Sequence, residues 1–180
     1  PIIDGLVAKK HFDKSPFALV LVPTRELALQ VSQEISNLSL KGVTSVVSVY
    51  GGQRIGGQIQ KIRSGANIVV ATPGRLLDLL GRDAINLEKI SYFIIDEADE
   101  MLNMGFIDDI EEIMEHTNDK KRTLLFSATM PKRIISLAKK YMKNHKVIMA
   151  KKVNETNNLI EQMYFQTKES KKQAFISKII

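Results

Sequence analysis

The chain has 180 residues and a net charge of +6, and 44% of its residues are apolar. This length and composition predict a soluble globular protein of about one domain with a hydrophobic core. The absence of cysteine excludes a disulfide framework and a zinc–thiolate site. Because no apolar run is long enough to span a bilayer and no signal peptide opens the chain, we expect a cytoplasmic protein without a membrane contact.

Apolar, strand-like runs alternate with segments of helical period along most of the chain. The alternation predicts βαβ units and an α/β fold, a parallel sheet with helices on both faces. Residues 1–3 form a short apolar opening, and a polar loop is expected at 8–15. The expected strands are 17–22, 43–50, 67–71, 92–96, 122–127 and 146–150, and the expected helices are 25–40, 53–64, 74–80, 98–117 and 132–142.

The last thirty residues have a different pattern. Residues 151–158 are polar and aperiodic, which is typical of a linker, and they are followed by an expected strand at 159–167 and helix at 170–180. That helix has no capping residue where the chain stops, so we expect the chain to be part of a larger protein. From Lys120 to Ile180 there are fifteen Lys or Arg residues and three acids. Such an excess fits a nucleic-acid surface and, equally, a solvated lysine-rich surface.

Two loops follow expected strands and carry an arginine at a helix start. Thr24, after the strand 17–22, is a good N-cap, and the free N–H groups behind it attract phosphate. Arg25 can grip phosphate oxygens or be tied to a structural carboxylate. In Thr72-Pro73-Gly74-Arg75, the cation of Arg75 opposes the helix macrodipole, a conflict that a bound polyanion or an internal salt bridge would resolve.

Paired glycines follow the expected strand 43–50. Gly51 and Gly56 have the glycine spacing of a phosphate-binding P-loop, but Gly57 stands where that loop needs Lys and Gln58 where it needs Ser or Thr. We therefore reject this segment as a nucleotide site. Paired glycines instead allow another backbone, or an RNA strand, to approach the loop closely.

The acidic segment Asp96-Glu97-Ala98-Asp99 directly follows an apolar run at 92–95. An apolar strand that ends in acids delivers carboxylates to the carboxyl edge of a parallel sheet, where ligands bind. One carboxylate suits a hydrated Mg²⁺ ion and a second can steer an attacking water. Ser127 and Thr129, at the end of the strand 122–127, offer hydroxyl groups to a neighbouring carboxylate, and Asp99 is the obvious candidate.

In this order the motifs resemble those of the DEAD-box family of ATP-dependent RNA helicases. The resemblance rests on PTRELA at 23–28, GG at 51–52, TPGR at 72–75, DEAD at 96–99 and SAT at 127–129, and it extends from residue 1 to about residue 150. It implies an incomplete RecA-like helicase domain of the P-loop NTPase type, and a parent protein that uses ATP and Mg²⁺ to unwind or remodel structured RNA or ribonucleoprotein.

The resemblance also assigns roles to residues. Asp96 would hold Mg²⁺ through water, and Glu97 would orient or deprotonate the water that attacks the γ-phosphate. Asp99, Ser127 and Thr129 would couple the nucleotide state to closure of two helicase domains. The sugar–phosphate backbone of one RNA strand would be held, without base specificity, by Thr24, Arg25, Gly51, Gly52, Thr72, Gly74 and Arg75.

Some parts of the family pattern do not occur in these residues. The Gly-Lys-Thr loop and the adenine-reading segment would precede Pro1, and after a first domain at 1–150 and a linker at 151–158 only the start of a second domain is expected at 159–180. We therefore expect no RNA-stimulated ATPase activity from the chain alone. In this fold the P-loop strand would be an inner strand beside 122–127. Without it, neighbouring strands lose backbone partners and apolar edges are exposed, so we expect the chain alone to be marginally stable or prone to aggregate.

Three functions are weighed. The first is part of an active RNA helicase, and the second is an ATPase-dead module that binds RNA or a partner. The retained acids and hydroxyls disfavour the dead module. A DNA translocase of the same superfamily is disfavoured by the DEAD and SAT motifs.

Overall fold

The computed structural model describes residues 1–8, 15–39, 44–142, 144–149, 164 and 166–179. The chain divides into two compact units, Pro1–Val147 and Ile148–Ile180. The first unit contains the sheet and all of the sequence motifs. Among the helices of the described ranges, none combines the length and the apolar composition that a membrane span needs.

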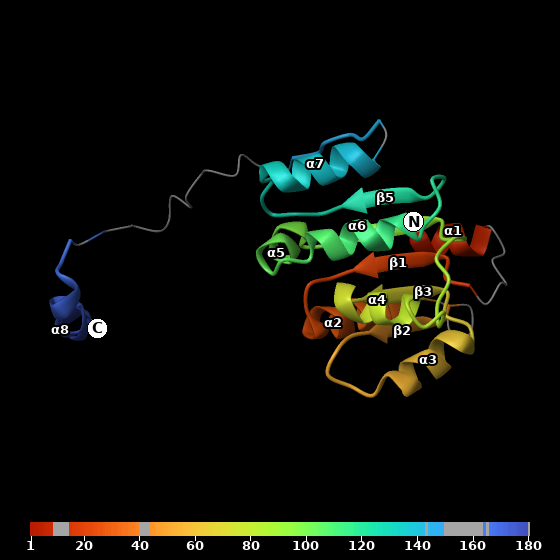
Figure 1. Ribbon diagram of the computed structural model, residues 1–180, viewed down its shortest axis with the longest axis horizontal. Coiled ribbons are helices and arrows are strands. Elements are labelled where there is room, and N and C mark those ends of the chain that lie inside the picture. Colours follow the sequence, from red (N-terminus) through yellow and green to blue (C-terminus); the bar gives the residue numbers. More distant parts are fainter. Residues whose placement is uncertain (9–14, 40–43, 143, 150–163, 165, 180) are drawn as a thin grey trace. The chain divides into compact units, whose positions relative to one another are not determined.

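The first unit is built on a five-stranded parallel sheet with the order β2-β3-β1-β4-β5 (Figure 1). Its strands are β1 (Ala18–Leu21), β2 (Val46–Val49), β3 (Ile68–Ala71), β4 (Tyr92–Ile95) and β5 (Arg122–Leu125). Every residue of β1 and β3 is buried, as expected for inner strands that are covered on both faces. The structure confirms the predicted parallel sheet and its five strands between residues 17 and 127.

Helices cover both faces of the sheet. They are α1 (Ile2–Ala8), α2 (Arg25–Leu38), α3 (Ile55–Arg63), α4 (Pro73–Leu80), α5 (Ala98–Asn103), α6 (Ile107–Glu115) and α7 (Lys132–Tyr141). Successive residues of β1 point to opposite faces. Leu19 and Leu21 pack in one cluster with side chains of α3 to α7, whereas Val20 packs on the other face with α1 and α2. This arrangement confirms the predicted helical layers.

Several predicted elements differ from the structure. The helix expected at 98–117 is two helices, because Gly105 adopts φ +85 and ends the first of them. The opening residues form α1, which was not predicted. Its Leu6 is buried, and the absence of a side chain at Gly5 lets the ring of Tyr92 pack close.

The strand predicted at 146–150 is wrong for residues 146–149, which form no strand. Their apolar side chains Val147, Ile148 and Met149 are exposed, so the apolar pattern there does not reflect burial in the sheet. The linker at 151–158 and most of the strand at 159–167 lie outside the described residues. The second unit contains a 3₁₀ turn (Glu169–Lys171) followed by α8 (Lys172–Ile179), close to the helix expected at 170–180.

Candidate functional site

The predicted site residues lie on loops at one edge of the sheet. The five strands end in register, since the last residues Leu21, Val49, Ala71, Ile95 and Leu125 align across the ladder. Backbone hydrogen bonds continue just past this line, from Thr72 N to Val49 O at 2.9 Å and from Asp96 N to Leu21 O at 3.0 Å. The carboxyl edge therefore carries the acidic, the hydroxyl and the arginine-bearing segments together.

The turn between β4 and α5 places two acids in different environments. Glu97 adopts the left-handed conformation, with φ 50 and ψ 50, and its N–H donates to Asp96 Oδ1 at 3.0 Å. Glu97 is exposed, whereas Asp96 is half-buried. A left-handed conformation costs a residue with a Cβ about 1–2 kcal/mol. Such strain is often kept at functional sites, where it aims a side chain.

Asp99 joins the acidic turn to the loop after β5. Its Oδ2 accepts hydrogen bonds from Thr129 N at 2.9 Å and from Thr129 Oγ1 at 2.8 Å. Its own N–H donates to Ser127 Oγ at 3.1 Å, and the Ser127 hydroxyl donates to Thr129 O at 2.6 Å. The predicted hydrogen bond from a hydroxyl to the Asp99 carboxylate is present for Thr129, whereas the Ser127 hydroxyl instead accepts a hydrogen bond from the Asp99 backbone N–H.

The hydrogen bonds around Asp99 set its ionisation. Burial alone would raise the pKa of the Asp99 carboxyl, but hydrogen bonds from the hydroxyl and the backbone N–H of Thr129 outweigh it and hold the pKa below the ordinary value. The carboxylate is therefore charged at neutral pH. A charged acceptor makes this link stronger than one between neutral groups.

The loop between β1 and α2 has the predicted cap. Thr24 Oγ1 accepts a hydrogen bond from Leu27 N at 3.3 Å and begins α2. The guanidinium carbon of Arg25 lies 5.2 Å from the ring centroid of Tyr50, which directly follows β2. Arg25 thus rests on an aromatic ring, and this contact ties the loop after β1 to the loop after β2.

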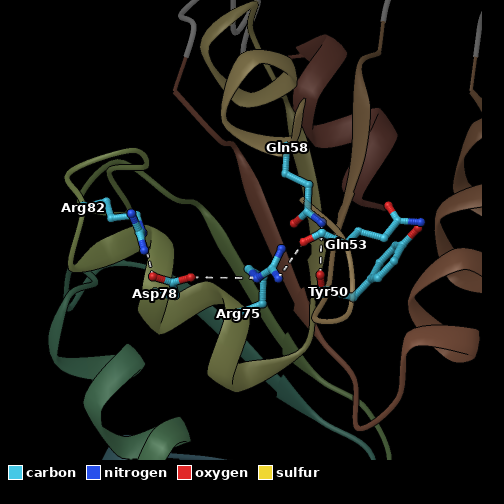
Figure 2. A network of polar contacts seen from close by, with 6 residues as sticks. All are labelled: Tyr50, Gln53, Gln58, Arg75, Asp78 and Arg82. Carbon is cyan, nitrogen blue, oxygen red and sulfur yellow. Dashed lines mark hydrogen bonds and ion pairs between the residues drawn. The ribbon is translucent and has the colours of Figure 1, made fainter. Parts of the chain in front are cut away.

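The loop between β3 and α4 places Arg75 against the loop after β2. Thr72 is the N-cap residue in extended conformation and Pro73 is the first residue of α4. Arg75 Nη2 donates to Gln53 O at 3.0 Å, and its Nε lies 4.0 Å from Asp78 Oδ2 (Figure 2). The internal salt bridge considered as an alternative is thus present with Asp78, and the hydrogen bond to Gln53 O brings Arg75 to the loop that contains Gly51.

The two glycines of the GG pair have different local requirements. Gly52 adopts φ +79, which only glycine tolerates well. A Cβ added at Gly51 would meet nothing within 4 Å, and one at Gly74 would only come within 4.0 Å of Asp109 Oδ2. No contact among the described residues therefore requires glycine at position 51 or 74, and an open backbone is left at both loops.

Two residues of this edge were not predicted as site residues. Gln58 is only 6% exposed and donates from Nε2 to Tyr50 O at 3.0 Å (Figure 2). From the sequence, Gln58 was interpreted only as a residue that does not fit a P-loop, and Tyr50 only as the last residue of an expected strand. Helical spacing could have indicated that Gln58 is buried, because it lies on the same apolar face of α3 as Ile55, Ile59 and Ile62.

The sheet, its order and its carboxyl-edge loops are those of a RecA-like helicase domain. The family model described as DEAD/DEAH box helicase matches residues 1–138, and the chain belongs to this family. It is 50% identical over 155 residues to a probable ATP-dependent RNA helicase of Methanocaldococcus jannaschii, which covers 86% of this chain and 41% of that protein. It is 46% identical over 155 residues to the DEAD-box ATP-dependent RNA helicase CshA of Bacillus subtilis, covering 86% of this chain and 31% of CshA.

Solved structures give the same result. The crystal structure of a DEAD box protein from the hyperthermophile Methanococcus jannaschii superposes with a TM-score of 0.74 at 47% identity, covering 92% of this chain and 44% of that one. That of a hypothetical ATP-dependent RNA helicase from Sulfolobus tokodaii has a TM-score of 0.69 at 45% identity, covering 73% and 39%. The chain thus spans less than half the length of each of these relatives.

Proposed function

We propose that the chain forms most of the first helicase domain of an ATP-dependent RNA helicase that unwinds or remodels structured RNA. The observation that carries the proposal is the division of the sheet edge. In the order β2-β3-β1-β4-β5, the loops with glycines and arginines follow the three adjacent strands β2, β3 and β1. The acids and hydroxyls follow the other two, β4 and β5, so that two chemically different sites lie side by side.

The β4–β5 half is the proposed nucleotide side. The carboxylate oxygens of Asp96 and Glu97 are the hard ligands that suit a hydrated Mg²⁺ ion, which would neutralise charge on the phosphates of ATP. Asp96 would hold that ion through water. Glu97, exposed and aimed by its left-handed turn, would orient the water that attacks the γ-phosphate and accept its proton.

The β2-β3-β1 half is the proposed RNA side. Helix starts at Thr24 and Thr72 present backbone N–H groups, and Gly51 and Gly74 leave room for a phosphate. Contacts of this kind recognise the sugar–phosphate backbone, so binding tolerates any base sequence. Asp99, linked to Ser127 and Thr129, would couple the nucleotide state to closure of the two helicase domains.

The domain limits and cellular context belong to the same proposal. Residues 1–150 would form the first domain, residues 151–158 a linker, and residues 159–180 the start of a second domain. A cytoplasmic location and ribonucleoprotein partners fit this role. The strained turn at Glu97 supports an active enzyme over an ATPase-dead module, because the turn costs stability and Glu97 is exposed.

Two measurements test the proposal. The chain should bind a fluorescently labelled single-stranded RNA more tightly than the DNA of the same sequence, as measured by anisotropy. The longer protein that carries this chain should hydrolyse ATP with stimulation by RNA, and Glu97→Gln should abolish that stimulation. Equal stimulation by RNA and DNA would favour a DNA translocase, and an unchanged rate in Glu97→Gln would remove Glu97 from the mechanism.

A further inference from the structure

Two side chains hold the backbone at the two ends of the turn 50–53. Gln58 of α3 donates to Tyr50 O at 3.0 Å, and Arg75 of α4 donates to Gln53 O at 3.0 Å. Figure 2 shows both side chains directed toward this turn from different helices. Gly51 and Gly52 lie between the two anchored carbonyls. The turn that carries the GG pair is therefore fixed at both of its ends.

Stability alone does not account for this arrangement. Gln58 is 6% exposed and lies on the apolar stripe of α3 with Ile55 and Ile62. Within the part of the chain that the structure describes, Gln58 Oε1 and Arg75 Nη1 are buried and have no hydrogen-bond partner. Unpaired buried polar atoms are destabilising. Such side chains are therefore better explained by what they position than by what they contribute to folding.

Burial also limits what Arg75 can touch. Its side chain is 12% exposed, and its Nη2 is engaged with the carbonyl of Gln53. Because Nη1 is buried as well, the guanidinium is not presented to a ligand at the surface. By contrast Arg82, just beyond the end of α4, pairs with Asp78 at 2.6 Å and its side chain is 55% exposed, so its charge is accessible.

We propose that Gln58 and Arg75 are positioning residues that preset the Gly51–Gly52 turn for an RNA phosphate. Arg75 then acts through Gln53 and makes no phosphate contact of its own. The effect extends to the neighbouring loop, since Tyr50, whose carbonyl Gln58 holds, also supports Arg25 through its ring. This inference rests on the proposed function, and it adds a residue, Gln58, and an indirect role for Arg75.

The test uses the whole chain and a labelled oligouridylate RNA, with affinity measured by anisotropy over a series of salt concentrations. Gln58→Met keeps the side-chain length and removes the donor to Tyr50 O. Arg75→Gln removes the charge that contacts the turn, and Arg82→Gln removes an equal charge just beyond the C-terminal end of α4 as the matched control. Thermal unfolding of each variant shows that the fold is kept.

We expect Gln58→Met to weaken RNA binding by roughly fivefold, the effect of one lost hydrogen bond. Arg75→Gln should weaken it similarly, while Arg82→Gln has little effect. The slope of log affinity against log salt should be the same in the Arg75 and Arg82 variants. A direct phosphate contact by Arg75 would instead lower the magnitude of that slope by about 0.7 in Arg75→Gln.

The outcomes separate this inference from the proposed function. If the unaltered chain does not bind the RNA, the proposed RNA surface fails and the positioning roles fail with it. If the unaltered chain binds the RNA, and both Gln58→Met and Arg75→Gln bind it with the same affinity as the unaltered chain, only the positioning roles are overturned. A reduced salt slope in Arg75→Gln would assign Arg75 to direct phosphate contact. Should Gln58→Met not fold, Arg75→Gln still tests the same turn.

Discussion

Asp99 Oδ2 accepts two hydrogen bonds from one residue, Thr129, at 2.9 Å from its backbone N–H and 2.8 Å from its hydroxyl. The two residues are thirty positions apart in the sequence. Asp99 lies in the first turn of α5, which follows β4, and Thr129 lies in the loop after the neighbouring strand β5. Half of the link is made by backbone, so substitution of Thr129 leaves one bond in place, whereas substitution of Asp99 removes both. This asymmetry leads to the first prediction.

Asp99→Ala should lower the free energy of unfolding by about 1–3 kcal/mol, as expected for hydrogen bonds to a charged group. Thr129→Ala should cost less, because the bond from Thr129 N remains. Urea unfolding of both variants at neutral pH measures the difference. Equal losses in the two variants would mean that the backbone bond contributes nothing.

The same link predicts a pH dependence. Since hydrogen bonding holds the pKa of the Asp99 carboxyl below its ordinary value, its contribution to stability is complete above the unfolded-state pKa and is lost as pH falls through the folded-state pKa. The stability difference between the unaltered chain and Asp99→Asn should therefore shrink as the pH falls from 7 to about 3. Urea unfolding at a series of pH values measures it, and a constant difference would contradict the prediction.

Glu97→Gly should raise the unfolding temperature, because glycine adopts φ 50 without the strain of a Cβ. A relief of about 1 kcal/mol corresponds to about 2–4 °C for a domain of this size. Glu97→Ala is the matched control, since it removes the same carboxylate but keeps the Cβ. Glycine also loses about 0.5–1 kcal/mol more backbone entropy on folding than alanine, so equal melting temperatures for the two variants would mean that the strain at Glu97 is no larger than this entropy cost.

Gly51→Ala should leave the fold unchanged and weaken RNA binding. A methyl group at position 51 meets nothing within 4 Å in the chain, so any loss of affinity reports on a ligand that approaches the loop. Gly56→Ala, in α3 and equally unobstructed, is the control and should not weaken binding. Gly52→Ala should instead lower stability by about 1 kcal/mol, because position 52 has a positive φ. Anisotropy and thermal unfolding distinguish the three.

The outer edge of β5 should make the chain prone to self-association. Among the described strands β5 has a neighbour on one side only, its residues are half-buried or exposed, and Phe126 beyond it is 53% exposed. Phe126→Lys should reduce association as measured by light scattering. Leu38→Lys, at an exposed apolar residue of α2, is the control and should have no such effect.

The sequence was most informative where pattern and local chemistry agreed. The runs at β1 and β4 are apolar because both faces are covered, and Thr24 and Thr72 mark helix starts that the structure places as expected. The break at Gly105 was missed because the acidic and apolar pattern continues across it, and only the backbone shows its positive φ. The segment 146–149 was misassigned because an apolar run does not reveal whether a neighbouring strand is available to pair with it.

The candidate site was predictable for residues whose type signals their chemistry, such as Asp96, Glu97 and Asp99. It was not predictable for residues that act through contacts between distant segments. Gln58 reaches a carbonyl eight residues back, and Arg75 reaches one 22 residues back. Such partners depend on how helices pack across the sheet, which no local pattern specifies.

Because the strands end in register, their spacing sets the length of RNA that the proposed site can contact. Neighbouring strands are about 4.8 Å apart, so the three adjacent loops after β2, β3 and β1 span about 10 Å. At about 3.4 Å per nucleotide of a stacked strand, this length accommodates about three nucleotides. The footprint of this unit is therefore short, and its affinity for single-stranded RNA should fall with salt with a slope near −2, about 0.7 for each phosphate.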